Sequence, residues 1–270
     1  MADRQPKDAY IRSQSNAIVK LVRSLQRRKM RYAERAFVID GVRGVEDAVR
    51  AGYMPSVLLV REDVADQIMP VLPGEADIRI VAERVFGSLS DVEQAQGVLG
   101  VFPMLWENHD VTAAAQGSTL VIDGVRDPGN CGTLLRSAAA AGMTQVILTQ
   151  DTVDPYNPKT VRSGVGAHVR IPFQIMGRDE AREALRDVPL VAVADANAPT
   201  IFDEVDWSGP CAIVIGSEAE GVSAAIRAIA THQVTVPLAN GVESLNAGVA
   251  GSLLMFEAAR QWRRSEYREW

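Results

Sequence analysis

The sequence predicts an α/β protein with two parts: a C-terminal domain built on a parallel sheet, and a smaller α/β domain before it. The short stretches between residues 119 and 236 are apolar throughout, which is typical of strands buried on both faces of a parallel sheet. Helical segments separate these stretches, and a shorter alternation of strand and helix runs from residue 37 to residue 81. With 270 residues and 47% hydrophobic content, the chain can bury one substantial core and a smaller second one.

The N-terminal part begins with a predicted helix over residues 11–35. Ile18, Leu21, Val22 and Leu25 form its apolar stripe, and Arg and Lys occupy its other faces. Strands are then expected at residues 37–39, 57–60 and 78–81, and helices at 45–51 and 63–69. We place this domain at residues 1–103 and a linker at 104–118, because residues 104–118 show no clear periodicity.

The C-terminal domain, residues 119–270, shows the clearer pattern. Strands are expected at 120–122, 146–148, 169–173, 190–194, 212–215 and 234–236. Helices are expected at 133–141, closed by Gly142, then at 158–164 and 178–186, with a last helix after Asn246. The first strand, helix and second strand make a βαβ unit.

The last helix carries two glycines in an otherwise apolar pattern. Val249, Leu253 and Phe256 form the i, i+4, i+7 stripe of a helix that faces the core. Gly248 and Gly251 each cost roughly 0.5–1 kcal/mol relative to Ala inside a helix, which indicates close packing against this backbone. The neighbour is either the same chain, a second subunit or a ligand.

Composition indicates a protein of a reducing compartment. Cys131 and Cys211 lie far apart without CxxC spacing, which fits free thiols better than a disulfide framework. The sequence has no apolar run of membrane-spanning length and no charged, apolar leader. We therefore expect a cytoplasmic protein without a membrane partner.

Charge is distributed unevenly along the chain. Residues 1–60 hold twelve Lys and Arg against six Asp and Glu, a balance of +6 that leaves −12 for the rest of a chain whose net charge is −6. This asymmetry favours polyanion recognition confined to the N-terminal domain. A basic helix face that is merely solvated is the alternative.

Three polar loops follow predicted strands, at the edge where parallel sheets bind ligands. They are Asp123–Gly132, running into a helix with Arg136, then Ile215–Gly221, then the stretch from Pro237 to Asn246. They contain neither GxGxxG, GxxxxGK[ST] nor GxSxG, which disfavours a Rossmann dinucleotide site, a P-loop and a serine hydrolase. The three histidines, His109, His168 and His232, lack metal-ligand spacing, so no metal site is expected.

In order, the loops read NxGxxxR, IGSExEG and VPLxxGxESLN. This set resembles the three signature motifs of the SpoU (TrmH-like) family of SPOUT RNA methyltransferases, over Thr119 to about Arg263. The preceding stretch from Asn16 to Gly52 is similar to the substrate-binding domain, related to a ribosomal protein, that often precedes it. The resemblance implies transfer of a methyl group from S-adenosylmethionine to a ribose 2′-hydroxyl of RNA, with ribosomal RNA as the expected substrate.

The resemblance also implies a trefoil knot near residues 213–254, with the cofactor bound in it, and a homodimer whose active site is completed across the interface. The cofactor-binding positions that it implies are Gly216, Val236, Leu238 and Leu245. The catalytic positions that it implies are Asn130, Arg136, Glu218, Ser244 and Asn246.

The chemistry suits these residue types. A ribose hydroxyl is a weak nucleophile at neutral pH, so it must be placed in line with the methyl group and lose its proton. Arg136 is expected to contact the hydroxyl or the adjacent phosphate, and since Arg rarely deprotonates, the proton leaves through water or a phosphate oxygen. We expect Asn130 and Glu218 to orient Arg136, the loop or the substrate.

Other roles are open for the same side chains. Asn130 suits a left-handed turn, Glu218 suits a helix N-terminus, and Ser244 suits the N-cap of the last helix. For Arg136, a charged side chain in a Leu- and Ala-rich helix calls for a partner.

The sequence departs from the family pattern at two positions: Gly248 replaces a second Ser, and Leu238 replaces Met. Gly248 and Gly251 suit close packing between two subunits. The alternative function is a non-catalytic RNA-binding or ribosome-assembly factor that keeps the knotted fold, and a third interpretation is a nucleotide-binding α/β enzyme.

Overall fold

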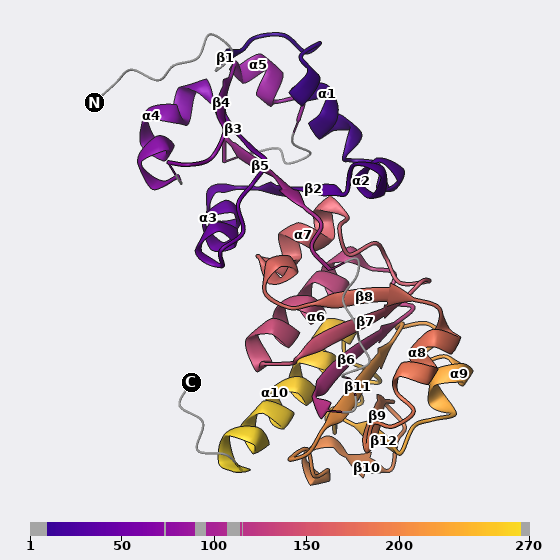
Figure 1. The fold of residues 1–270 in the computed structure, drawn as a ribbon. Helices are drawn as coiled ribbons and strands as arrows, with labels where there is room; N and C mark the ends of the chain where they lie inside the picture. The colour runs from indigo at the N-terminus through magenta and orange to yellow at the C-terminus, as the bar shows by residue number, and fades with distance from the viewer. Residues whose placement is uncertain (1–9, 73, 90–95, 107–113, 115, 266–270) are drawn as a thin grey trace. The chain divides into compact units, whose positions relative to one another are not determined.

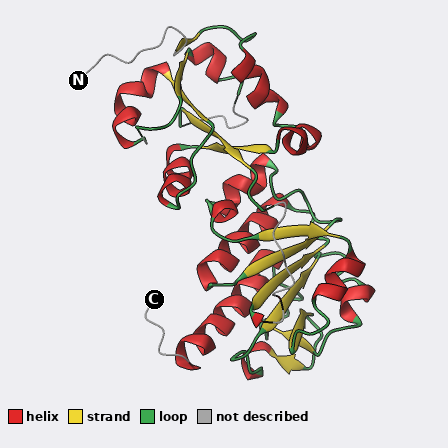
Figure 2. Ribbon diagram, in the orientation of Figure 1, coloured by secondary structure: helices red, strands yellow, loops and turns green. Residues whose placement is uncertain are grey.

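The computed structural model describes residues 10–72, 74–89, 96–106, 114 and 116–265. The chain forms two compact units, shown in Figure 1. The first contains Met1–Leu105 together with Tyr156–Val169, and the second contains Trp106–Pro155 and Arg170–Trp270. Each unit is built around its own sheet (Figure 2).

The first unit holds a five-stranded mixed sheet of order β1-β4-β3-β5-β2. Its strands are β1 (Tyr10–Ile11), β2 (Ala36–Asp40), β3 (Val57–Arg61), β4 (Ile78–Val81) and β5 (Val98–Pro103). β5 runs antiparallel to β2 and β3, whereas β4 is parallel to β1 and β3. The helices are α1 (Ala17–Ser24), α2 (Arg28–Glu34), α3 (Val42–Arg50), α4 (Ala65–Ile68), α5 (Glu83–Phe86) and α7 (Pro158–Gly164).

The predicted helix over residues 11–35 is wrong in extent, because it is two helices. α1 begins after Asn16, whose side chain accepts a hydrogen bond from the amide of Ile18, and α2 starts at Arg28. The buried Arg31 of α2 donates through Nη1 to the carbonyls of Leu25 and Gln26 between the two helices, each at 2.8 Å. These bonds satisfy carbonyl groups that a continuous helix would pair internally. Arg31 is therefore a structural residue of the basic region.

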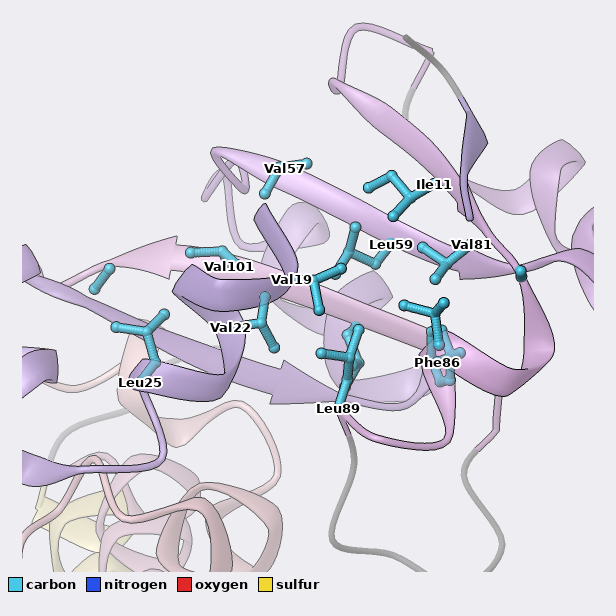
Figure 3. Packing of buried hydrophobic residues seen from close by; sticks show 14 residues of the cluster. Ile11, Val19, Val22, Leu25, Val57, Leu59, Val81, Phe86, Leu89 and Val101 are labelled. Carbon is cyan, nitrogen blue, oxygen red and sulfur yellow. The ribbon is translucent and has the colours of Figure 1, made fainter. Parts of the chain in front are cut away.

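The core of the first unit confirms that the apolar stripe of α1 faces inward. Val19, Val22 and Leu25 are buried in the hydrophobic cluster of this unit (Figure 3). Ile18 and Leu21 are partly buried and pack against the same cluster. α7 packs on β2 in this unit, and Tyr156, which precedes α7, lies 4.9 Å from Phe37 between ring centroids. A segment from the second half of the chain therefore contributes to the N-terminal unit.

The second unit holds a seven-stranded sheet in which all the paired strands are parallel, with order β10-β12-β9-β11-β6-β7-β8. Its strands are β6 (Ser118–Asp123), β7 (Gln145–Thr149), β8 (Phe173–Met176), β9 (Leu190–Ala194), β10 (Thr200–Ile201), β11 (Cys211–Gly216) and β12 (His232–Thr235). Its helices are α6 (Pro128–Ala141), α8 (Arg178–Ala184), α9 (Ala224–Arg227) and α10 (Ala247–Ser265). Figure 1 shows α6 and α10 on one face and α8 and α9 on the other, which confirms a parallel sheet covered on both sides.

Two predicted elements of this unit need correction. The strand expected at 169–173 begins only at Phe173, since Ala167–Val169 forms a 3-10 turn. Val169 and Ile171 are buried outside any strand, so their apolar character reflects burial and not strand structure. The helix expected at 133–141 begins at Pro128, five residues earlier, where Asp127 caps it by accepting a hydrogen bond from the amide of Asn130 at 2.9 Å.

The predicted inward face of the last helix is also wrong. Val249, Leu253 and Phe256 are 46%, 40% and 45% exposed. The residues of α10 that are buried in their place are Ala247, Gly248, Gly251, Leu254, Met255, Ala258 and Ala259. The predicted stripe of Val249, Leu253 and Phe256 is therefore a second apolar face of α10, which faces solvent.

The two glycines of α10 pack within the same chain. A Cβ at Gly251 would lie 2.3 Å from Leu134 Cδ2, and a Cβ at Gly248 would lie 3.1 Å from the Thr133 side chain. Both contacts are with α6, so the glycines let α10 approach α6 closely. Of the three possible neighbours, the structure shows the same chain.

Candidate active site

A cavity of about 380 Å³ lies in the second unit at the carboxyl ends of β9, β11 and β12. This is the edge where a parallel sheet binds ligands. Its walls come from the ends of these strands, the loop after β11, the segment 236–246 and the start of α10. The lining residues are Ala194, Asp195, Ala196, Ile215, Gly216, Ser217, Glu218, Ala219, Glu220, Gly221, Arg227, Val234, Thr235, Val236, Leu238, Ser244, Leu245, Ala247, Ala250 and Leu254.

All four predicted cofactor positions line this cavity. Gly216 ends β11 and forms its floor, while Val236, Leu238 and Leu245 belong to the segment between β12 and α10. A Cβ at Gly216 would lie 2.2 Å from the carbonyl carbon of Gly221, and no side chain fits there. Gly216 therefore allows the loop Ser217–Gly221 to fold back on the end of β11, where Ser217 and Gly221 exchange backbone hydrogen bonds.

Three of the predicted catalytic residues meet in one hydrogen-bonded cluster beside the cavity. Asn130 Nδ2 donates to Glu218 Oε1 at 2.5 Å, and Asn246 Nδ2 donates to Asn130 Oδ1 at 2.7 Å. Asn246 Nδ2 also lies 3.4 Å from Glu218 Oε1. Asn130 is 8% exposed and lies in the first turn of α6, so the alternative of a left-handed turn is wrong. We name Asn130, Glu218 and Asn246 the amide–carboxylate cluster.

The start of α10 fixes the geometry of this cluster. Asn246 Oδ1 accepts a hydrogen bond from the amide of Val249 at 3.2 Å, so Asn246 caps the helix and the alternative of Ser244 as N-cap is wrong. Glu218 Oε1 lies 3.4 Å from the amide nitrogen of Ala247, the first residue of α10. The positive end of the helix dipole stabilises a carboxylate at this position. Glu218 thus stands at a helix N-terminus contributed by another segment of the chain.

Ser244 and Arg136 stand outside the amide–carboxylate cluster. Ser244 lines the cavity and is exposed. Arg136 lies six residues after Asn130 on α6, about 9 Å further along the helix axis, and it is exposed. Among the described residues no hydrogen bond or ion pair joins Arg136 to another side chain, so its guanidinium is open for a ligand.

The sequence reasoning missed Asp123, the last residue of β6. Its carboxylate is buried and accepts hydrogen bonds from Arg178 Nε at 3.0 Å, the amide of Ser223 at 2.7 Å and Thr149 Oγ1 at 3.2 Å. Burial alone raises the pKa of Asp123, but the bonds from Ser223 and Arg178 outweigh it and leave the pKa below its ordinary value. An acid at the end of the apolar run Leu120–Ile122 was the available signal, because a charge there needs buried partners.

The reasoning also missed the pair of Asp195 and Arg227 in the cavity wall. Arg227 Nη1 donates to Asp195 Oδ2 at 2.6 Å, and Asp195 follows β9 directly. The hydrogen bond from the amide of Asn197, together with Arg227, lowers the pKa of Asp195. No motif pointed to this pair, since its members lie 32 positions apart in the chain.

Other predicted features have plainer placements. Cys131 and Cys211 are free and buried, and burial raises the pKa of each thiol to about 12. His168 is buried and His232 is exposed, while His109 lies outside the described residues. In the part of the chain that the structure describes, no His, Cys, Asp and Glu gather in a group that could hold a metal ion. Over the same residues, no helix is both long and apolar enough to cross a membrane.

Comparison with known proteins places both parts of the chain. Residues 117–256 match the SpoU rRNA methylase family, and residues 16–100 match the MRM3-like substrate binding domain. An uncharacterised tRNA/rRNA methyltransferase of Synechocystis is 31% identical, over 95% of this chain and 96% of its own. The 23S rRNA guanosine 2′-O-methyltransferase RlmP of Bacillus subtilis is 31% identical, over 91% of this chain and 97% of its own.

Solved structures agree with this assignment. The AdoMet-bound rRNA methyltransferase of Sinorhizobium meliloti superposes with a TM-score of 0.81 at 27% identity, covering 93% of this chain and 97% of that chain. AviRb of Streptomyces viridochromogenes in complex with AdoMet gives a TM-score of 0.80 at 26% identity, covering 93% of this chain and 100% of that one. With the loops, the cavity and these matches together, the chain belongs to the SpoU rRNA methylase family.

Proposed function

We propose that this protein transfers a methyl group from S-adenosylmethionine to a ribose 2′-hydroxyl of ribosomal RNA. The observation that carries the proposal is the amide–carboxylate cluster, in which Asn130 of α6, Glu218 of the loop after β11 and Asn246 at the start of α10 meet beside a cavity. The family match and the relatives that are named as rRNA 2′-O-methyltransferases support the same reaction.

The residues of the cavity fit S-adenosylmethionine. Val236, Leu238 and Leu245 offer apolar surface for an adenine ring, and the loop Ser217–Gly221 offers backbone groups. Glu218 supplies a carboxylate that two amide groups hold and that suits a cationic ligand. When bound, S-adenosylmethionine supplies an electrophilic methyl group on a sulfonium. We propose Gly216, Val236, Leu238 and Leu245 as its binding residues.

We propose Asn130, Arg136, Glu218, Ser244 and Asn246 as the catalytic set. Glu218 and Asn246 hold the Asn130 amide, so the cluster is ordered before substrate arrives, and this order lowers the entropic cost of alignment. Ser244, exposed at the cavity, contacts the substrate ribose. Arg136 binds the phosphate beside the target ribose, for which a planar guanidinium is well suited. The 2′-hydroxyl proton leaves through water or a phosphate oxygen.

We propose that residues 1–103 bind the RNA substrate, that 104–118 link the domains, and that 119–270 carry methyl transfer. The exposed basic residues of the α1–α2 region support the first part, and they are Lys20, Arg27, Arg28, Lys29 and Arg35. Neutralising Arg27, Arg28 and Lys29 together in the full chain is expected to weaken RNA binding and to flatten its salt dependence. Neutralising Arg182 of α8 and Arg186, which follows this helix, is the control, and equal effects of both sets would contradict the assignment.

We further propose that two copies of the chain pair through the exposed face of α10. Val249, Leu253 and Phe256 support it, because three large apolar side chains at i, i+4 and i+7 form one exposed stripe. Leu238 and Val242, in the segment just before α10, add further exposed apolar surface. A symmetric pair would bury the same stripe on both subunits.

The chain is proposed to be knotted near residues 213–254, supported by the packing of α10 on both α6 and β11 after the chain has lined the cavity with residues 236–246. A cytoplasmic location is proposed, supported by the two free thiols Cys131 and Cys211.

The experiment that tests the function incubates the full chain with ribosomal RNA and S-adenosylmethionine labelled in the methyl group. Methylated ribose resists alkaline cleavage, so the expected result is one labelled, cleavage-resistant position. The Arg136→Ala variant should lose the label and keep binding S-adenosylhomocysteine. If the wild-type chain bound both RNA and S-adenosylhomocysteine but transferred no methyl group, the non-catalytic RNA-binding alternative would replace the proposal.

A further inference from the structure

The ion pair of Asp195 and Arg227 stands in the cavity wall and has no role in the chemistry described so far. Asp195 follows the last residue of β9, and Arg227 ends α9. Both side chains are partly buried, with 23% and 33% of their surface exposed. Arg227 is the one Lys or Arg among the described residues that line the cavity.

The carboxylate of Asp195 is held firmly from two sides. Its Oδ1 accepts a hydrogen bond from the amide of Asn197 at 3.0 Å, and its Oδ2 accepts one from Arg227 Nη1 at 2.6 Å. Arg227 is itself anchored, since its Nη1 also lies 3.3 Å from Gln233 Oε1. Each carboxylate oxygen has two acceptor positions, so both oxygens can accept a further hydrogen bond from a ligand in the cavity.

Charge decides which ligand group fits this carboxylate. Arg227 already neutralises Asp195, so a cationic group gains little there, whereas a neutral donor gains a charge-assisted hydrogen bond. Glu218 differs, because its partners are amides and not a cation, and it suits the positive part of the cofactor. The vicinal diol of a ribose offers two neutral donors, and an acid at the end of a parallel strand binds such a diol in dinucleotide folds.

We propose that Asp195 accepts hydrogen bonds from the ribose 2′,3′-diol of S-adenosylmethionine and that Arg227 is a positioning residue for Asp195. The inference rests on the proposed function, because it takes S-adenosylmethionine as the occupant of the cavity. Two acids that line the cavity then hold different parts of the cofactor: Asp195 the diol and Glu218 the sulfonium side.

Calorimetric titration of the full chain with three ligands tests the inference. They are S-adenosylhomocysteine, its 2′,3′-dideoxy analogue, and 5′-methylthioadenosine, which keeps the ribose but lacks the amino-acid group. Asp195→Ala should lower the affinity for S-adenosylhomocysteine and for 5′-methylthioadenosine by a similar factor, about tenfold or more. The wild-type chain should bind the 2′,3′-dideoxy analogue more weakly than S-adenosylhomocysteine. In Asp195→Ala, the affinities for these two ligands should be nearly equal. Arg227→Met should weaken both diol-bearing ligands by a smaller factor.

Controls separate a ligand contact from a structural role. Asp195→Asn keeps an oxygen for the Asn197 amide, and its melting temperature should stay near that of the wild type. Asp179→Ala, on the exposed side of α8, should change no affinity, because its side chain is 86% exposed and lies outside the cavity.

The outcomes distinguish the inference from the proposed function. The inference is wrong if Asp195→Ala lowers the affinity for S-adenosylhomocysteine but not for 5′-methylthioadenosine. It is also wrong if loss of the diol lowers the affinity by the same factor in the wild type and in Asp195→Ala. In either case the cofactor assignment stands. If Arg227→Met weakens only S-adenosylhomocysteine, Arg227 binds the amino-acid carboxylate and its positioning role is wrong. A wild-type chain that binds none of the ligands overturns the cofactor assignment and the inference with it.

Discussion

Asn246 donates its side-chain amide to Asn130 Oδ1 at 2.7 Å, which joins two residues 116 positions apart, and the same Asn246 caps α10 through its Oδ1. The side-chain oxygen therefore caps a helix, and the side-chain nitrogen binds another residue of the candidate site. The two roles can be separated, because a serine at this position can cap the helix but has no amide group.

The first prediction concerns this residue. Asn246→Ser keeps a capping oxygen but loses the amide, so we expect unfolding free energy within about 0.5 kcal/mol of the wild type and a fall in methyl transfer of about tenfold or more. Asn246→Ala should show the same loss of transfer and should cost about 1 kcal/mol of stability as well. Denaturant titration and single-turnover assays measure the two effects. Full activity of Asn246→Ser would show that the amide has no part in the reaction.

The second prediction concerns Gly216 at the floor of the cavity. Its Cβ would meet the backbone of Gly221 and Val222 at 2.2–2.3 Å, so Gly216→Ala should push the loop Ser217–Gly221 away from β11. We expect the unfolding free energy to fall by about 1–3 kcal/mol. We also expect the variant to bind S-adenosylhomocysteine too weakly to measure. Gly209→Ala is the control, because nothing lies within 4 Å of a Cβ there. Equal behaviour of the two variants in thermal melts would contradict the steric argument.

The third prediction concerns Asp123, whose pKa is lowered in the folded chain. A lowered pKa contributes stability above the ordinary pKa of 3.8, and this contribution is lost as pH falls through the folded value. Asp123→Asn should therefore cost about 1.5–3 kcal/mol near neutral pH, where the hydrogen bonds from Ser223 and Arg178 are charge-assisted. The difference from the wild type should narrow below pH 3.8. Urea titrations across pH measure it, and a difference independent of pH would exclude the linkage.

The sequence predicts strands of this fold well where burial alone determines them. The strand at 190–194 and the helix at 158–164 have the predicted bounds, and each other strand expected in the C-terminal part overlaps an observed one, although that at 169–173 does so only at Phe173. The start of α6 was missed because its first turn, from Pro128, is polar and glycine-bearing and gives no apolar period. Short elements such as β10 and α9 have too few residues to show a period at all.

The sequence predicts which residues belong to the site, but not which of them contact one another. Motifs brought Asn130, Glu218 and Asn246 to attention, yet only the fold reveals that they bond to one another. The inward face of α10 was misjudged because Val249, Leu253 and Phe256 have the period of a buried stripe, while the small residues that do face α6 gave a weaker signal. Periodicity reports an apolar face but not what covers it.

The fourth prediction follows from that exposed stripe. Leu253→Glu and Phe256→Glu should convert the proposed dimer into the 29.2 kDa monomer, because a charge on a buried apolar interface is strongly unfavourable. Light scattering after size exclusion measures the mass. Met69→Glu is the matched control, since Met69 is 41% exposed but lies in the first unit. A wild-type chain that is monomeric at micromolar concentration would contradict the pairing.

The fifth prediction concerns Arg136, which is exposed on α6 outside the amide–carboxylate cluster of its own chain. Its removal should cost less than about 0.5 kcal/mol of stability, as for most surface substitutions. Methyl transfer by Arg136→Ala should nevertheless fall about 100-fold, with S-adenosylhomocysteine affinity unchanged, and Arg136→Lys should restore only part of it because lysine lacks the planar fork. Arg182→Ala, exposed on α8, should keep full activity.

Mixing two impaired variants tests whether Arg136 acts in the site of the other subunit. If the partner subunit's Arg136 completes each site, a heterodimer of Arg136→Ala and Asn246→Ser chains holds one site with both residues intact. Random re-pairing should then restore roughly a quarter of the wild-type rate. If instead Arg136 serves the cluster of its own chain, every site in the mixture lacks one residue and the rate does not rise above the mean of the two variants. The Leu253→Glu background, which blocks pairing, should abolish any recovery, so the rate of the mixture distinguishes a site shared between subunits from one built within a single chain.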